Sequence, residues 1–311
     1  MEISELPTVP VTWGTAGTHG ISRARFRQAV RRGLVRPVLR GVFVRTDVCL
    51  TLEVKLAAAA LVINDSAVAC DRTAAWIWGI DVHSWGELDD VPPIETYVLR
   101  GHRPTNRGEV RGGERDLWPV DWVVVGGVKV TTPVRTAMDL GCCLPRRDAL
   151  AAMDALMRAH EFTHRDMTSL LCRYFRRRGV VQLRELVPLV DPRAESRPES
   201  WTRLELIDNG LPIPELQWWV DVDGVPTYRL DLAYVHARVA VEYNGAETHT
   251  SAADRARDRL RRDWLEAHGW IVIVVDRSDF SRTSERFWPG EVAAALARAQ
   301  QQPQRQYARR R

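Results

Sequence analysis

Four apolar segments between residues 216 and 276, interrupted by one long helical segment, constrain the fold most strongly. They read LQWWVDV, TYRLDLAY, RVAVEYN and WIVIVVD, and each has the β-branched and aromatic content of a strand. Ahead of the last one, TSAADRARDRLRRDWLEAHG predicts a helix that ends at Gly269. A helix from Ser196 to Asn209, closed by Gly210, precedes all four. The predicted order is α-β-β-β-α-β, an α/β domain over residues 196–311.

The two middle strands carry a pair of acidic residues. If TYRLDLAY and RVAVEYN form an antiparallel hairpin that turns at His236 and Ala237, Asp231 lies directly opposite Glu242. Opposed residues have Cβ atoms about 4.5–5.5 Å apart, so two carboxylates there repel each other. The other sheet face would then be apolar core, formed by Leu230, Leu232, Val241 and Tyr243.

A bound divalent cation would remove this repulsion, and oxygen ligands on rigid strands suit Mg²⁺ or Mn²⁺. The alternative is two solvated acids on an exposed face. His249 follows in a loop, and the next helix carries Asp258, Arg261 and Arg262 on one side. Hydrolysis of a phosphodiester needs metal carboxylates, a proton carrier and cations for phosphate. A stripe of the same helix is expected to pack on the sheet: Ala253, Ala256, Leu260, Trp264 and Ala267.

The segments AESRPESW, YRLDLAY, VAVEYNG and DRLRRDWLEAHGWIVIVV resemble the PD-(D/E)XK endonuclease-like domain of very-short-patch-repair (Vsr-like) nucleases. The resemblance implies that Asp231 and Glu242 are the metal-binding acids, with Glu199 in the outer shell. It also implies that His249 handles protons, and that Asp258 and Arg261 form the D-x-x-R of the long helix. The family's EYDG reads EYNG here, with Asn244 in the third place, and its histidines fall where this chain has Glu247 and Thr248. An asparagine such as Asn244 can position a water or bond a phosphate oxygen, but it supplies no charge.

The N-terminal region is strongly basic. Residues 1–50 hold eight arginines against three acidic residues, whereas the whole chain has a net charge of +4. ISRARFRQAVRRG predicts a helix capped by Ser22, and LVRPVLRGVFV predicts a hairpin; with a helix ahead of them, the order is that of a winged helix-turn-helix. A solvated surface helix is the alternative. The DNA-contacting residues predicted here are Arg23, Arg25, Arg27, Arg31, Arg32, Arg36 and Arg40.

The segments HGISRARFRQAVRRGLVRPVLRGVFV and TPVRTAMDLG resemble AbiEi-type winged-helix antitoxins of actinobacteria. Between the two ends, residues 51–195 predict a mixed α/β region with helices at LEVKLAAAALVI and RRDALAAMDALMRAH and a strand pair in VDWVVVGGVKVTTPV. Arg-rich YFRRRG, at residues 174–179, is interpreted as a solvated helix end, with weak phosphate contact as the alternative.

The composition argues against several classes of protein and of metal site. Five cysteines without a CxxC pair argue against a disulfide scaffold or a cysteine zinc site. No apolar run is long enough to span a bilayer, and the N-terminus lacks a signal sequence, so a cytoplasmic protein is expected. The predicted function is metal-dependent cleavage of double-stranded DNA, with no membrane and no small-molecule substrate. The alternative is a catalytically silent regulator or antitoxin with a cognate toxin, in which the nuclease fold serves as an interaction module.

Overall fold

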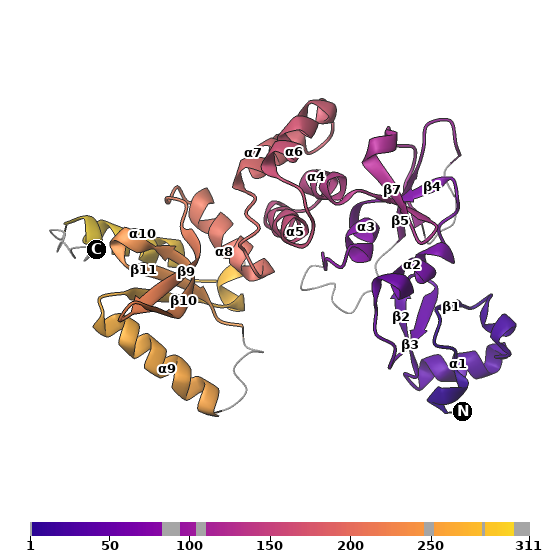
Figure 1. Ribbon diagram of the computed structural model, residues 1–311, viewed down its shortest axis with the longest axis horizontal. Coiled ribbons are helices and arrows are strands. Elements are labelled where there is room, and N and C mark those ends of the chain that lie inside the picture. Colours follow the sequence, from indigo (N-terminus) through magenta and orange to yellow (C-terminus); the bar gives the residue numbers. More distant parts are fainter. Residues whose placement is uncertain (1, 83–93, 104–109, 246–251, 282–283, 302–311) are drawn as a thin grey trace. The chain divides into compact units, whose positions relative to one another are not determined.

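The computed structural model describes residues 2–82, 94–103, 110–245, 252–281 and 284–301 (Figure 1). Within these ranges the chain is a mixed α/β protein with ten α-helices and three β-sheets. It divides into two compact units, unit 1 at Met1–Val190 and unit 2 at Asp191–Arg311. None of the described helices is both long and apolar enough to cross a bilayer. The finer division at residue 50 stays a prediction.

The N-terminal part of unit 1 is one helix packed on a small sheet. Helix α1 spans Arg23–Arg31, and the Ser22 side chain caps it by accepting a hydrogen bond from the Arg25 amide, as predicted. The predicted hairpin is confirmed, and a short strand extends it into a sheet of order β1-β3-β2. Its strands are β1 (Val11–Thr12), β2 (Val35–Leu39) and β3 (Val42–Arg45). Phe26 and Phe43 lie in its core, and the more exposed Trp13 packs edge to face on both rings.

The first helix of the predicted helix-turn-helix does not form among residues 2–22. That segment contains β1 and two 3-10 turns, Ile3–Glu5 and Ala16–His19. The prediction was wrong because prolines and glycines recur every three or four residues there, which leaves no run long enough for an α-helix.

The rest of unit 1 is a five-stranded sheet, of order β6-β5-β4-β8-β7, with helices around it. The predicted helices at LEVKLAAAALVI and RRDALAAMDALMRAH are α2 and α5, and the predicted strand pair is β7–β8, joined by Gly126 and Gly127 at positive φ. The strands are β4 (Ala67–Ala69), β5 (Ile94–Val98), β6 (Val110–Arg111), β7 (Trp122–Val125) and β8 (Val128–Thr131). The helices are α2 (Leu52–Ala60), α3 (Asp71–Ile77), α4 (Pro133–Cys143), α5 (Arg146–Ala159), α6 (His164–Leu170) and α7 (Val180–Leu186).

Unit 2 has the predicted order of elements, followed by one more helix. Its sheet, of order β12-β11-β10-β9, is antiparallel except for the parallel pair β11–β12. The Ser196 side chain caps α8, and Gly210 follows that helix at φ 78°. The elements are α8 (Arg197–Asp208), β9 (Glu215–Val222), β10 (Val225–Tyr234), β11 (Val239–Tyr243), α9 (Ala252–Ala267), β12 (Ile271–Val275) and α10 (Trp288–Gln301).

Helices cover both faces of this sheet, so each face has its own core (Figure 1). On one face Leu232 and Val241 pack against α8 and α10. On the other, Leu230 packs with Leu265 of α9, which corrects the prediction that Leu230 and Leu232 share a face. The predicted stripe of α9 is confirmed at Trp264, which packs against this core, but it was wrong at Leu260, which is 68% exposed whereas Leu265 is fully buried. Helix α9 is rotated so that charged residues, rather than Leu260, face the strand ends.

Candidate functional sites

The clearest candidate site lies in unit 2, where the β10–β11 hairpin brings two acidic residues together. Leu232 pairs with Val241, so Asp231 and Glu242 occupy the next opposed positions, as the sequence predicts. The Tyr243 amide donates a hydrogen bond to the carboxylate Oδ2 of Asp231 at 3.2 Å. The two acids therefore lie at the point where the backbone pairing of the hairpin ends.

Asp231 has an unusual electrostatic environment. Burial, followed by the negative charges of Glu199 and Glu242, raises the pKa of Asp231 to about 7. The Tyr243 amide and the Arg261 guanidinium act in the opposite direction but are outweighed. Three carboxylates this close favour the uptake of a proton or a cation.

Glu199 lies in the first turn of α8 and is 8% exposed. Its carboxylate accepts hydrogen bonds from the Glu195 amide at 2.9 Å, the Ser196 hydroxyl at 2.8 Å and the Gln217 side-chain amide at 2.7 Å. These three donors fix its orientation, and its charge acts on Asp231. The residue that the resemblance placed in the outer shell is therefore held beside the acid pair.

Glu242 is paired with a cation from α9. The Arg261 guanidinium donates to both carboxylate oxygens of Glu242, with 2.9 Å between Nη1 and Oε2, and its Nη2 also donates to the Arg229 carbonyl at 2.7 Å. This bidentate geometry is the strong form of an arginine–carboxylate pair. Arg261 thus ties α9 to the strands and offsets the charge of one acid.

A polar pocket of about 250 Å³ opens in front of these residues. At about 30 Å³ per water, it has room for a phosphate group and several waters. Of the seven predicted catalytic residues, five line this pocket, and Glu199 acts on Asp231 from α8. His249, and with it Glu247 and Thr248, lies outside the described residues. The lining residues are Arg229, Asp231, Glu242, Tyr243, Asn244, Asp258, Arg261, Arg262 and Val274.

One lining arginine, Arg229, was missing from the predicted site. It precedes Asp231 by two positions on β10, but Leu230 and Leu232 lie on opposite faces, so regular alternation does not place it there. Arg262 lines the pocket beside Arg261, on the side of the helix where the sequence placed it as a cation for phosphate. Arg229 is also held by both carboxylate oxygens of Glu195, each at 2.8 Å.

The donor chemistry of the pocket fits a small divalent cation. Asp231 and Glu242 supply hard carboxylate oxygens on neighbouring strands, which is what Mg²⁺ and Mn²⁺ prefer. Among the residues that the structure describes, no group of three or more His, Cys, Asp or Glu side chains is arranged to hold a metal ion. A cation here would therefore need a further oxygen from another kind of residue or from water.

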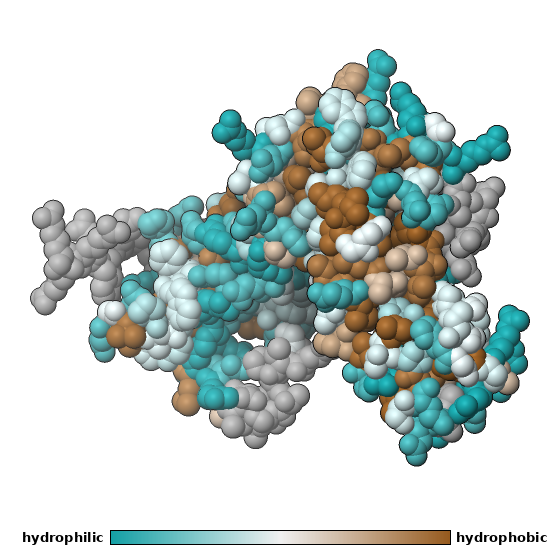
Figure 2. Space-filling model, turned by 45° about the vertical axis from the view of Figure 1, so that its right-hand side comes forward, coloured by the Kyte–Doolittle hydropathy of each residue, from teal (hydrophilic) through white to brown (hydrophobic). Residues whose placement is uncertain are grey.

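A second candidate site is the basic surface of α1 and the β2–β3 turn. Of the seven predicted DNA-contacting arginines, six are exposed. Arg36 is half-buried and donates from Nη2 to the Val48 carbonyl at 2.8 Å, and Arg25 is paired with Glu5 at 2.9 Å. Hydrophilic residues cover much of the lobe that carries α1, at the lower right of Figure 2. The exposed set is Arg23, Arg25, Arg27, Arg31, Arg32 and Arg40.

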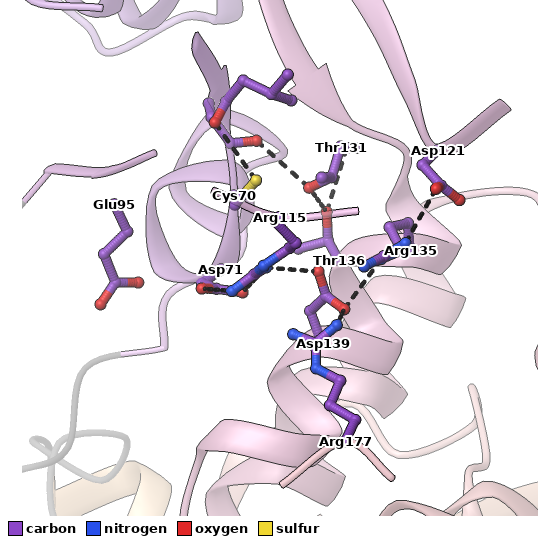
Figure 3. Close-up of polar contacts among 12 residues, drawn as sticks. Cys70, Asp71, Glu95, Arg115, Asp121, Thr131, Arg135, Thr136, Asp139 and Arg177 are labelled. Carbon is purple, nitrogen blue, oxygen red and sulfur yellow. Dashed lines mark hydrogen bonds and ion pairs between the residues drawn. The ribbon is translucent and has the colours of Figure 1, made fainter. Parts of the chain in front are cut away.

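Unit 1 also contains a buried network of ion pairs that was not predicted from the sequence (Figure 3). Asp139 of α4 is fully buried and accepts hydrogen bonds from Arg115, Arg135 and Arg177 at 2.6–3.0 Å. Arg115 also pairs with both carboxylate oxygens of Asp71, at 2.8 Å each. Interpreting YFRRRG as a solvated helix end was therefore wrong for Arg177, which reaches into the interior. The i, i+4 spacing of Arg135 and Asp139 was the signal available in the sequence.

Comparisons with known proteins confirm the AbiEi resemblance for part of unit 1. Residues 67–189 match the family model described as the AbiEi antitoxin C-terminal domain. Two curated proteins of Mycobacterium tuberculosis resemble almost the whole chain: "Uncharacterized protein MT2308" of strain CDC 1551 / Oshkosh and "Uncharacterized protein Rv2248" of strain ATCC 25618 / H37Rv. Each is 33% identical over 275 residues, which cover 87% of this chain and 94% of the relative.

Proposed function

We propose that this chain, which belongs to the same family as MT2308 and Rv2248 of Mycobacterium tuberculosis, is a DNA-binding regulator of the antitoxin type. The observation that carries this proposal is the position of a basic helix and hairpin directly ahead of the AbiEi antitoxin C-terminal domain. Exposed arginines on α1 and at the β2–β3 turn supply the positive charge that duplex DNA attracts. On duplex DNA, α1 would lie in the major groove and the hairpin would contact the backbone.

The first experiment compares two triple variants of the full chain on a labelled DNA duplex. Arg27→Ala, Arg31→Ala and Arg40→Ala together remove three exposed charges from the proposed surface. The matched control removes three exposed arginines elsewhere in unit 1, at Arg165, Arg178 and Arg184. By fluorescence anisotropy, the first variant is expected to lose most of its affinity while the control keeps it. Equal losses in the two variants would refute the proposed surface.

The antitoxin description also supports the predicted toxin partner. The test is co-expression of the full chain with the product of a neighbouring gene, scored by rescue of cell growth. Toxicity that the full chain does not relieve would count against this part of the proposal.

The pocket of unit 2 supports a second function, metal-dependent hydrolysis of a phosphodiester on a PD-(D/E)XK-like fold. The specific observation in its favour is that Asp231, Glu242, Asp258 and Arg261 line one pocket on adjacent strands and a helix. A divalent cation, when bound, supplies a water of lowered pKa and charge for the phosphate. Asp231 and Glu242 would hold that cation, with Glu199 behind Asp231.

The other residues of the pocket would bind and orient the DNA. Arg262 and Arg229 line the pocket, where their guanidinium groups would contact phosphate oxygens. Arg261 would orient Glu242 through its two hydrogen bonds. Asn244 would bond a water or a phosphate oxygen. His249, predicted to move the proton, stays a prediction.

The test is nicking of supercoiled plasmid with Mg²⁺, with Mn²⁺ and with EDTA. The wild-type chain is expected to nick with either metal and not with EDTA. Asp231→Asn should abolish nicking without reducing DNA affinity, whereas Asp221→Asn, at an exposed position of β9, should have no effect. Nicking that persists in Asp231→Asn would place any hydrolytic site elsewhere, and a wild-type chain that never nicks would leave the regulator as the function.

A further inference from the structure

The middle of the exposed face of α1 carries two uncharged residues. An α-helix turns by about 100° per residue, so residues three and four apart lie on one side of it. Phe26 and Ala29 are buried in the core of the N-terminal part of unit 1. By this spacing, the positions that point directly away from that core are Ala24, Gln28 and Arg31, and all three are exposed. Ala24 and Gln28 therefore lie on the middle line of the face proposed to enter the major groove.

Arginines lie on both sides of this middle line. Arg23 and Arg27 follow one side of α1, and Arg25 and the C-cap residue Arg32 follow the other. The guanidinium of Arg25 is already paired with Glu5, at 2.9 Å. Arginines at the edges of a helix that lies in a groove reach the phosphates along that groove, and such contacts carry no sequence information. The flanking arginines thus supply affinity and orientation, whereas the middle line faces the bases.

Gln28 has the hydrogen-bonding groups that read a base. Its side-chain amide combines a carbonyl acceptor with an NH₂ donor. In the major groove adenine presents the complementary pair, N7 as acceptor and N6 as donor, and glutamine bonds both at once. The Gln28 side chain is exposed and makes no hydrogen bond with another described residue. Ala24, one turn earlier, is too small to hold the helix away from the bases.

We infer that Gln28 reads an adenine in the major groove and sets the sequence preference of this DNA-binding surface. Because glutamine carries no charge, the phosphates do not compete for it as they do for the arginines around it. This inference rests on the proposed DNA-binding function, to which it adds that binding depends on sequence. A different base pair at the contacted position should weaken binding roughly tenfold or more.

The experiment first uses the full wild-type chain to select duplexes from a library of randomised sequence. Fluorescence anisotropy then compares the selected duplex with duplexes in which one A·T pair is changed to G·C. The wild type should lose roughly tenfold in affinity at one A·T pair, which Gln28→Ala should not distinguish. Gln28→Arg should prefer G·C at that same pair, because arginine bonds O6 and N7 of guanine. Gln300→Ala, the same change at an exposed position of α10, should keep the wild-type preference.

Four results would overturn the inference. If the wild type binds duplexes but selects none, the surface does not read bases, although the proposed function stands. If Gln28→Ala keeps the wild-type preference at every pair, another residue reads the adenine. If Gln28→Ala weakens binding to all duplexes by the same factor, Gln28 contacts the backbone. A wild type that binds no duplex removes the proposed function together with this inference. Alanine favours helix more than glutamine does, so Gln28→Ala should keep α1 folded, and thermal melting checks this.

Discussion

Replacing Asp231 by asparagine is expected to stabilise the metal-free protein at pH 8. In the folded chain the pKa of Asp231 is raised from 3.8 to about 7, chiefly by burial and then by Glu199 and Glu242. A tenfold change in a proton-binding constant corresponds to about 1.4 kcal/mol, so the ionised carboxylate lowers the free energy of unfolding by up to about 4 kcal/mol. Asparagine has the same shape, carries no charge and still accepts from the Tyr243 amide.

The effect has a defined pH dependence. Because the folded-state pKa is the higher one, the contribution of Asp231 to stability is most favourable below about pH 4. It declines as the pH rises from about 4 to about 7. Above about pH 7 the ionised Asp231 carboxylate lowers the free energy of unfolding by its full amount. The difference in stability between Asp231→Asn and the wild type should therefore be near zero at pH 4 and largest at pH 8.

The assay is thermal melting in EDTA at several pH values. A gain of about 2–4 kcal/mol corresponds to a rise of roughly 10 °C in the midpoint for a domain of this size. Asp221→Asn, at an exposed position of the same sheet, should stay within about 0.5 kcal/mol of the wild type at every pH. An Asp231→Asn variant that melts at the wild-type temperature at pH 8, or whose gain is the same at pH 4, would refute the reasoning.

Two further substitutions test the packing of unit 1. Asp139→Asn removes a buried negative charge that three arginines share, so it should lower the free energy of unfolding by about 3–5 kcal/mol in urea denaturation; a loss below about 1 kcal/mol would contradict the network as a stabilising element. A left-handed backbone conformation costs an alanine roughly 1–2 kcal/mol. Gly179→Ala should lower the free energy of unfolding by well over that amount, because the new Cβ would lie 2.0 Å from the Cys142 carbonyl oxygen. Gly210→Ala has a similar φ but open space, so it serves as the control, and equal losses at the two glycines would exclude the steric argument.

The local features of the fold could be predicted from the sequence because short-range chemistry determines them. Ser22 and Ser196 are helix caps whose hydrogen bonds are made within three residues. The register that opposes Asp231 and Glu242 follows from the position of one turn. The apolar alternation of the two strands allows few other registers. This part of the candidate site could therefore be predicted by counting residues from the turn.

Other features depend on tertiary placement. Leu260 was assigned to the buried stripe of α9 from its spacing, yet Leu265 packs in the core and Arg261 pairs with Glu242, whereas Leu260 is exposed. Arg177 lies in an arginine run that looks solvated, but its partner, Asp139, is 38 residues away in the chain. The left-handed backbone of Gln217 has no sequence signal, because glutamine carries no preference for it.

The most direct test of the central claim, that the N-terminal basic surface binds DNA, is the salt dependence of binding. Each phosphate contact contributes about 0.9 to the slope of log affinity against log salt concentration. Arg27→Ala, Arg31→Ala and Arg40→Ala together should therefore flatten the slope of the full chain by roughly two to three units. The control variant of Arg165, Arg178 and Arg184 should keep the wild-type slope. A triple variant at α1 and the hairpin turn whose slope equals that of the wild type would contradict the account.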